Sequence, residues 1–434
     1  MAPKACTPQE AAALVRPVDT VAFGLGPANP DAFFVALSER DDWENLILGG
    51  ALLLGYYNVF TKPGVSYRSG FFGPVERLLV AGGHNIELVP NGFRQFGSTL
   101  ARFKPRVMTA QAAPPEHGSV NLSLHYGGTR DELLAAGRDP ERLLVIEVNP
   151  NLPRTSSRPP FDNTVPLDVI DVLIEADGQP VALPELVETE EDQRIAAHAL
   201  DFVVDGATLQ TGIGTIPNMV AMTLAAGSGG DYGVHSEMFT DGLMRLHQAG
   251  KVTNLSKGEF EGVSVTTFAL GSAELYRWLD RNEEVAFLPV AVVNDPTVIG
   301  SNEKLVSING ALAVDLFGQV VADSIDGRQI SGVGGHEDFA SAADLRVDAH
   351  SLVCLRSTVD IGGERRSRIV ARLPEGAIIS TPRHHANVVV TEYGAAELAG
   401  LTVRERAHAL AEIAHPDERP ALREAAEKMD RPPA

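Results

Sequence analysis

Apolar runs that favour β-strands alternate with helical segments along the first part of the chain. A helical pattern follows the first run and carries Phe33, Phe34 and Leu37 on its apolar face. Strands that are apolar throughout and separated by helices are typical of a mostly parallel sheet covered on both faces. The strands expected here are Val18 to Phe23, Asn45 to Leu54, Leu143 to Val148, and Val169 to Glu175.

The same order restarts in the middle of the chain. A helix is expected near residues 192–203, then a strand at Ala207 to Thr211, then Gly212-Ile213-Gly214 and another helix. The segment 205–224 repeats the pattern of 18–37, although a generic strand–turn–helix signature would give the same repeat by chance. We predict two related open α/β domains with mostly parallel sheets, spanning 1–186 and 187–434, with the active site in the cleft between them.

The C-terminal half adds a hairpin and a third glycine-rich stretch. Leu312 to Asp323 is expected to form a hairpin turned at Phe317-Gly318, and a helix is expected from His336 to Ala343. Between them lies Ser331-Gly332-Val333-Gly334-Gly335, whose backbone N–H groups are able to approach a ligand closely. Most glycine-rich loops are plain turns, so this stretch alone does not define a site.

Composition and charge exclude several classes of protein. A length of 434 residues favours two domains, and a net charge of −21 argues against binding to nucleic acid or to an anionic membrane. No apolar run reaches the roughly 20 residues of a membrane span, and no N-terminal signal peptide is recognised. Cys6 and Cys354 form no disulfide framework, so a cytoplasmic location is expected.

The strongest candidate for chemistry is Glu237. It is expected at the end of a short strand, Tyr232 to Ser236, with Met238 and Phe239 beside it. A carboxylate at a strand end between apolar groups is a candidate nucleophile. Taken alone, a glutamate here would more often be a surface charge or a carboxylate in the first turn of a helix.

The loop at Gly212 and Gly214 precedes a helix, and free N–H groups at a helix N-terminus form a cradle for an anion. No Gly-Lys-Ser/Thr follows, and the third glycine of a dinucleotide fingerprint is absent, so neither a phosphate loop nor a nicotinamide site is expected. His384 and His385 are adjacent and would point to opposite faces of a strand, so no metal site is expected there.

Six ordered segments together resemble the acetyl-CoA hydrolase/transferase family, the group that includes 4-hydroxybutyrate CoA-transferase and butyryl-CoA:acetate CoA-transferase. The segments are EVNPNLPRT at 147–155, LQTGIGTIPN at 209–218, GVHSEMFTDG at 233–242, VNDPTVIGSNEKLVSING at 293–310, GQVVADSIDGRQISGVGGHEDF at 318–339, and STPRHHANVVVTEYG at 380–394. They span nearly the whole chain, which makes the resemblance specific.

The resemblance implies roles for particular residues. Glu237 would be the residue that attacks the acyl-CoA, and the coenzyme would be a substrate rather than a permanent cofactor. The residues implied to bind CoA are Gly212, Gly214, Thr215, Ile216, Pro217, Asn218, Ile330, Gly332, Gly334 and Gly335. The residues implied to line the reacting centre are Gln210, Asn309 and Leu25, of which Gln210 and Asn309 are equally compatible with structural roles.

The implied reaction is transfer of CoA from a short- or medium-chain acyl-CoA to a small carboxylate such as acetate, through a covalent glutamyl-CoA thioester and ping-pong kinetics. An acyl-CoA hydrolase using the same glutamate is the nearest alternative, with His235 as its candidate base. A non-catalytic acyl-CoA-binding protein is a third, although binding alone does not require Glu237.

The sequence also departs from the family pattern. Leu25 replaces a residue that is often His in the family, and His336 stands where Gln is usual. The Leu25 change indicates either a more apolar acyl pocket or a different acceptor. The acyl group, the acceptor and the oligomeric state stay open, with a homodimer as one option.

Overall fold

The computed structural model describes residues 3–184, 187–212 and 214–429, and these residues form two compact units. The first unit contains residues 1–184 together with 265–293 and 330–334, and the second contains 185–264, 294–329 and 335–434. Each unit is described by itself below. The predicted domains, 1–186 and 187–434, stay a prediction.

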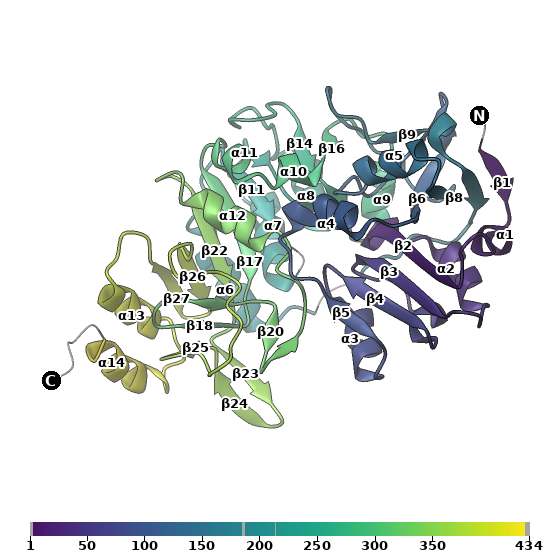
Figure 1. Cartoon of the computed structure of the whole chain (residues 1–434). Coiled ribbons are helices and arrows are strands. Elements are labelled where there is room, and N and C mark those ends of the chain that lie inside the picture. Colours follow the sequence, from purple (N-terminus) through teal and green to yellow (C-terminus); the bar gives the residue numbers. More distant parts are fainter. Residues whose placement is uncertain (1–2, 185–186, 213, 430–434) are drawn as a thin grey trace. The chain divides into compact units, whose positions relative to one another are not determined.

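The first unit is built on a parallel sheet (Figure 1), in the order β1-β10-β8-β6-β2-β3-β4-β5. Every neighbouring pair along this order is parallel. The chain builds the sheet outward in opposite directions from β2 and β6. The strands are β1 (Lys4–Cys6), β2 (Val18–Leu25), β3 (Asn45–Ala51), β4 (Val65–Ser69), β5 (Ile86–Leu88), β6 (Val107–Glu116), β8 (Leu143–Val148) and β10 (Val172–Glu175). In addition, β7 (Ser119–Asn121) pairs antiparallel with β6, and β9 (Thr164–Pro166) pairs antiparallel with β7.

An aromatic cluster forms part of the core of this unit. Phe23 on β2 stacks on Tyr67 of β4, with ring centroids 5.6 Å apart, and packs edge-on against Phe34 at 4.8 Å. All three side chains are fully buried. The helices of this unit are α1 (Pro8–Ala12), α2 (Asp31–Ser38), α3 (Pro74–Ala81), α4 (Phe96–Phe103), α5 (Arg130–Arg138), α9 (Ala273–Leu279) and α10 (Val290–Val293), with 3-10 turns at Gly26–Ala28, Asn58–Thr61, Phe93–Gln95 and Leu167–Val169.

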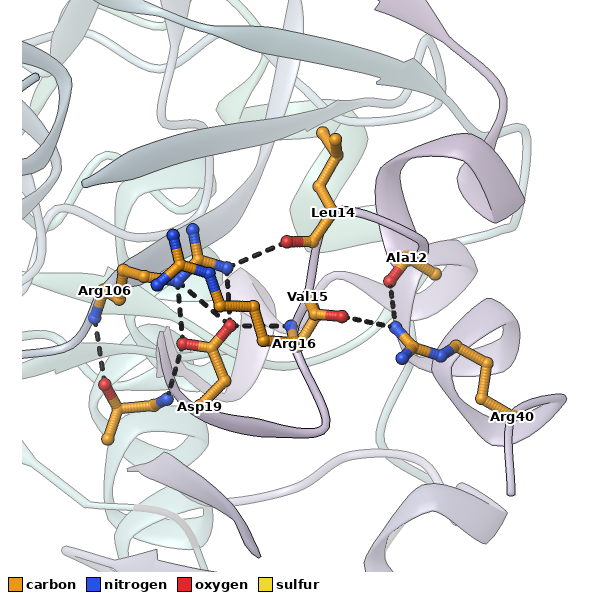
Figure 2. Close-up of polar contacts among 8 residues, drawn as sticks. Ala12, Leu14, Val15, Arg16, Asp19, Arg40 and Arg106 are labelled. Carbon is orange, nitrogen blue, oxygen red and sulfur yellow. Dashed lines mark hydrogen bonds and ion pairs between the residues drawn. The ribbon is translucent and has the colours of Figure 1, made fainter. Parts of the chain in front are cut away.

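Two arginines fix the turn between α1 and β2 (Figure 2). The guanidinium of Arg40 donates to the carbonyl oxygens of Ala12 and Val15, both at 2.6 Å. Arg106 pairs with the buried carboxylate of Asp19 through Nε, at 2.8 Å, and donates from Nη2 to the carbonyl of Leu14, at 2.8 Å. These bonds hold carbonyl groups at the end of α1 and in the turn that follows it.

The second unit contains a sheet in the order β12-β11-β17-β22-β26-β27, parallel except for its last pair. These strands are β11 (Thr208–Thr211), β12 (Gly233–Val234), β17 (Leu305–Gly310), β22 (His350–Cys354), β26 (Val388–Thr391) and β27 (Gly394–Glu397). The helices are α6 (Glu190–Leu200), α7 (Thr215–Ala226), α8 (Asp241–Gln248), α11 (Pro296–Gly300), α12 (His336–Ala343), α13 (Val403–Glu412) and α14 (Arg419–Glu427).

The remaining strands are short. They are β13 (Met238–Phe239), β14 (Ser264–Thr266), β15 (Phe268–Ala269), β16 (Val285–Phe287), β18 (Ala313–Asp315), β19 (Val320–Val321), β20 (Ser324–Ile325), β21 (Arg328–Gln329), β23 (Thr358–Ile361), β24 (Glu364–Ser367) and β25 (Ile369–Val370). Within the described ranges, no helix combines the length and the apolar character needed to cross a membrane.

These elements confirm the α/β fold with mostly parallel sheets. Leu143–Val148 is a strand as predicted, α12 covers His336–Ala343, and β18 and β19 form the predicted antiparallel hairpin. The strand expected at Tyr232 to Ser236 is shorter, because β12 ends at Val234 and Glu237 lies between β12 and β13.

Candidate active site

The segment that carries Glu237 is tied to the carboxyl end of β11. Strand β12 pairs with β11, and beyond the strand the backbone N–H of His235 still donates to the carbonyl of Leu209, at 3.0 Å. The Ser236 hydroxyl then lies 3.2 Å from the carbonyl oxygen of Thr211 and 2.7 Å from that of Met238. Side-chain contacts of Ser236 thus replace the sheet ladder and fix the backbone on both sides of Glu237.

Asn294 holds the carboxyl group of Glu237. Its Nδ2 donates to Oε2 of Glu237 at 2.6 Å and to Oδ2 of Asp338 at 3.1 Å. Asn294 is fully buried and immediately precedes Asp295, which caps the N-terminus of α11. Since Nδ2 faces two carboxyl groups, the orientation of the amide is fixed by its partners.

Gly335 approaches the same carboxyl group from the N-terminus of α12. A Cβ atom at this position would lie 1.9 Å from Oε2 of Glu237 and 2.3 Å from Nδ2 of Asn294. Contacts this short are impossible for a side chain, so the site requires glycine here. The backbone of Gly335 also hydrogen-bonds Glu237. Both a side chain and the backbone thus donate to Glu237.

The pKa of Glu237 is raised to about 7, mainly by burial, which outweighs the lowering by the hydrogen bonds from Asn294 and Gly335; the nearby charge of Asp338 adds to the rise. Roughly half of the carboxyl groups would then be ionised at neutral pH. A carboxylate with weakened solvation and a fixed orientation is suited to nucleophilic attack.

Glu147 is a second carboxyl group with a strongly raised pKa, of about 8, caused by burial. It is fully enclosed, and its Oε2 accepts from the backbone N–H of Phe33 in the first turn of α2, at 3.0 Å. A carboxyl group enclosed at a helix N-terminus has a structural role. Glu237, which is partly exposed, is the better candidate for chemistry.

The glycine loop of the second unit lies directly after β11. Gly214 is the N-cap of α7 and has a φ of 138°, which favours glycine, whereas a Cβ at Gly212 would meet only one atom within 4 Å, the Ile308 carbonyl oxygen at 3.8 Å. Packing of the described residues therefore leaves open space at Gly212. Thr215, Ile216, Pro217 and Asn218 form the first turn of α7, and Ile213 lies outside the described residues.

The structure brings Gln210 and Asn309 together on the neighbouring strands β11 and β17. Asn309 Nδ2 donates to Oε1 of Gln210 at 3.2 Å, and Gln210 Nε2 lies 3.5 Å from Oδ1 of Asn309. Each amide is thus a partner of the other, which fits the structural reading of these residues. A role at the reacting centre stays a prediction.

Of the predicted site residues not yet described, Leu25, Ile330, Gly332 and Gly334 belong to the first unit, and Gly335 belongs to the second. Within the first unit Arg77 donates to the carbonyl of Ile330 at 2.6 Å, and the carbonyl of Gly334 accepts from Phe93 at 2.9 Å. A Cβ at Gly332 would lie 2.9 Å from the carbonyl oxygen of Gly70, so glycine is needed there for packing. Leu25 is buried at the end of β2. Binding of CoA by these residues stays a prediction.

His235 is enclosed by the second unit. Its side chain is fully buried, its Nδ1 lies 3.3 Å from Nδ2 of Asn302, and its ring lies 6.4 Å from those of Phe260 and Phe339. His336, next to Gly335, is also buried, and burial lowers its pKa to about 4. A histidine needs a pKa near neutrality and access to water to act as an efficient general base, and neither residue combines the two.

Asn294 and Asp338 are the residues that sequence reasoning missed. Both lie within segments that carry the family resemblance, but neither was singled out. The sequence feature that could have drawn attention to Asn294 is its place directly before Asp295-Pro296, where helix α11 begins. Among residues 3–184, 187–212 and 214–429, no group of three or more His, Cys, Asp or Glu is arranged to hold a metal ion.

The fold and the site together define a class: an α/β protein with a partly desolvated glutamate that is held by Asn294 and Gly335. Comparison with known proteins gives the family. The C-terminal domain model of acetyl-CoA hydrolase/transferase matches residues 271–426. The chain is 34% identical to succinyl-CoA:cyclohexane-1-carboxylate CoA transferase of Geobacter metallireducens, covering 99% of this chain and 96% of that protein.

Butyryl-CoA:acetate CoA-transferase of Anaerostipes caccae is also 34% identical, over 97% of this chain and 95% of its own length. The crystal structure of 4-hydroxybutyrate CoA-transferase from Porphyromonas gingivalis has a TM-score of 0.79 at 30% identity, covering 98% of this chain and 97% of that one. An acetyl-CoA hydrolase of Eremothecium gossypii is more distant, at 26% identity over 71% of this chain and 62% of its own. The chain belongs to the acetyl-CoA hydrolase/transferase family, as the sequence segments predicted.

Proposed function

We propose that this protein is a CoA-transferase that moves CoA between a short- or medium-chain acyl-CoA and a small carboxylate such as acetate. The carrying observation is the Glu237 carboxyl group, held by Asn294 and Gly335 with its pKa raised to about 7. The names of the relatives support the reaction class, since those compared over nearly the whole chain are CoA-transferases. A cytoplasmic location and a homodimer stay predictions of the sequence.

In the first half of the proposed reaction, an ionised oxygen of Glu237 attacks the thioester carbonyl. The C–S bond breaks, and CoA leaves as a thiolate from a mixed anhydride between the acyl group and Glu237. The thiolate then attacks the side-chain carbonyl carbon of Glu237. The acyl group leaves as a free carboxylate, and a glutamyl-CoA thioester remains. An acceptor carboxylate repeats these steps in reverse and leaves as the new acyl-CoA.

Attack on the side-chain carbon of Glu237 places negative charge on a glutamyl oxygen. Nδ2 of Asn294 lies 2.6 Å from Oε2, and the Gly335 backbone hydrogen-bonds the same side chain. Donors fixed at the oxygen where charge develops stabilise a tetrahedral intermediate. We assign this stabilising role to Asn294 and Gly335, and a positioning role to Asp338, which accepts the second bond from Asn294.

Binding of CoA is assigned to the two glycine segments. The open space at Gly212 and the N-terminus of α7 suit close approach of a ligand to backbone N–H groups. The residues proposed to contact CoA are those implied by the family resemblance: Gly212, Gly214, Thr215, Ile216, Pro217, Asn218, Ile330, Gly332, Gly334 and Gly335.

Hydrolysis by the same glutamate is the second candidate, favoured by the similarity to an acetyl-CoA hydrolase. A hydrolase needs a base that reaches the attacking water. The enclosure of His235 and the low pKa of His336 support transfer over hydrolysis.

The decisive experiment is detection of the glutamyl-CoA thioester. Incubation with an acyl-CoA and no acceptor should add the mass of CoA to the peptide that contains Glu237. Glu237→Gln should abolish the adduct and reduce turnover by several orders of magnitude. Glu259→Gln removes an exposed carboxylate of the same unit and should change neither. An adduct on another residue, or none at all, would refute the assignment.

A further inference from the structure

The N-terminus of α12 lacks the side-chain cap that usually fixes a helix end. Its N-cap residue is Gly335, which makes no side-chain hydrogen bond to the first turn. Ser, Thr, Asp or Asn would normally accept from the free N–H groups there, but a Cβ at this position would collide with Oε2 of Glu237. Other contacts must therefore fix the first turn of α12, which also carries Asp338.

Glu337, in the same turn, makes such a contact. Its Oε1 is hydrogen-bonded to Nδ1 of His385, and both side chains are partly shielded from water, at 31% and 27% exposure. A carboxylate only accepts, so Nδ1 of His385 is the donor. The other carboxyl oxygen of Glu337, Oε2, is buried and has no hydrogen-bond partner among the described residues. Within these residues, His385 is thus the partner that fixes the Glu337 carboxylate.

His385 itself is tied to the sheet of the second unit. It lies in a turn just before β26, where its backbone N–H donates to the carbonyl of Pro382 at 2.9 Å. Strand β26 pairs with β22, and α12 packs against β22. Two residues further on, Asn387 hydrogen-bonds the carboxyl group of Asp344, the C-cap residue of α12. The segment 385–387 therefore holds α12 at both of its ends.

We propose that His385 is a positioning residue for Glu237 and acts through Glu337. Glu337 follows Gly335 by two residues and immediately precedes Asp338, so moving its anchor moves both neighbours. Both act on Glu237, because the Gly335 backbone hydrogen-bonds its carboxyl group and the Asp338 charge lies near it. A displacement of about one ångström at a reacting group can cost about 10²-fold in rate. This role of His385 rests on the proposed reaction at Glu237, whereas its bond to Glu337 does not.

The test compares three replacements of His385 in the transfer reaction. Alanine removes the donor, asparagine keeps a donor near the place of Nδ1, and glutamine moves the donor to the place of Nε2. We expect kcat to fall about tenfold or more in His385→Ala and His385→Gln, with KM for acyl-CoA unchanged, because the lost alignment acts in the transition state. His385→Asn should recover most of the wild-type kcat. Circular dichroism checks that each variant is folded.

A double-mutant cycle tests whether the effect passes through Glu337. Glu337→Ala should lose as much kcat as His385→Ala, and the double variant should lose no more than either, since all three break the same contact. His408→Ala is the matched control, because it breaks a His–Glu pair of the same unit, 3.3 Å from Glu427, and should leave kcat unchanged. Additive losses, equal kcat in His385→Asn and His385→Ala, or wild-type kcat in His385→Ala overturn the proposal.

Hydrogen exchange of the free protein separates this contact from the proposed function. It reports the first backbone bond of α12, from the N–H of Phe339 to the carbonyl of Gly335, at 3.2 Å. A peptide covering 336–343 should exchange faster in His385→Ala than in the wild type or in His385→Asn. If the wild type forms no CoA adduct but this difference is seen, the proposed function is wrong and the contact stands. If the adduct forms and neither exchange nor kcat changes in His385→Ala, the role of His385 alone is wrong.

Discussion

Asn294 donates to Glu237 and to Asp338 at once, so the protonation of Glu237 depends on a neighbouring carboxylate. Attack requires the ionised form of Glu237, whose pKa is raised to about 7. We therefore expect kcat/KM for acyl-CoA to fall as the pH drops through about 7, rather than near the usual glutamate value of about 4.3. A pH–rate profile measured with saturating acceptor checks this.

The variant Asp338→Asn tests whether the charge of Asp338 helps to raise the pKa of Glu237. Removing the negative charge favours ionisation of Glu237, so the acidic limb of the profile should move to lower pH. The maximum rate should also fall, because a neutral amide oxygen accepts a weaker hydrogen bond from Asn294 than the carboxylate does. Glu259→Gln, an exposed change of equal charge, should leave the limb in place. A limb that does not move in Asp338→Asn would show that Asp338 has no part in setting the pKa.

Gly335 is the position where the smallest change should have the largest effect. Its backbone conformation, φ −96° and ψ 8°, is open to alanine, but a Cβ would lie 1.9 Å from Oε2 of Glu237. Gly335→Ala should therefore displace the carboxyl group and lower kcat by about 10²-fold or more while the protein stays folded. In Gly310→Ala, where a Cβ would meet nothing within 4 Å, steady-state kinetics should match the wild type.

At this scale, the sequence singled out Glu237 as a candidate because a local motif surrounds it. It did not single out Asn294, which lies 57 residues after Glu237, or Asp338, which lies 44 residues after Asn294. Only folding brings these side chains together, and neither has a local pattern that specifies a carboxylate partner. A contact between chain segments far apart in sequence leaves no periodic pattern in a single sequence.

At the scale of elements, the turn between α1 and β2 depends on the buried pair of Asp19 and Arg106, whose side chains are 2% and 20% exposed. Arg106→Met leaves a buried carboxylate without its guanidinium and frees the carbonyl of Leu14. We expect a loss of about 3 kcal/mol in stability, seen as a lower urea midpoint. Arg194→Met makes the same change in an exposed pair with Glu190, at 54% and 74% exposure, and should cost about 0.5 kcal/mol or less. Equal midpoints for the two variants would contradict this.

Elements that depend on continuous apolar runs were predictable, as β8 at Leu143–Val148 illustrates. The length of the strand before Glu237 was not predictable in this way. Its apolar run extends from Tyr232 to Ser236, but the strand pairs with β11 only at Gly233 and Val234. Beyond that point the Ser236 hydroxyl replaces the ladder. Side-chain to backbone bonds of this kind compete with regular secondary structure, and the local sequence gives little sign of which will form.

At the scale of the whole molecule, the balance of transfer against hydrolysis is the property to measure. If water is kept from the glutamyl anhydride, acetate or another short carboxylate should raise acyl-CoA consumption far above its rate in buffer. The kinetics should be ping-pong, and the CoA ester of the acceptor should form. Equal consumption with and without carboxylate, with free CoA as the only CoA product, would establish the hydrolase instead.

The first unit is made of three separate segments of the chain, and this has a consequence for the growing chain on the ribosome. Residues 265–293 belong to this unit, and within it the N–H of Tyr126 donates to Thr267 at 2.8 Å and that of Phe287 to Ser156 at 2.8 Å. Domains usually fold as they are synthesised, from the N-terminus onward. Here the first unit stays incomplete until the translation of its last segment, 330–334, by which time strands β11, β12 and β17 of the second unit's sheet have already been made.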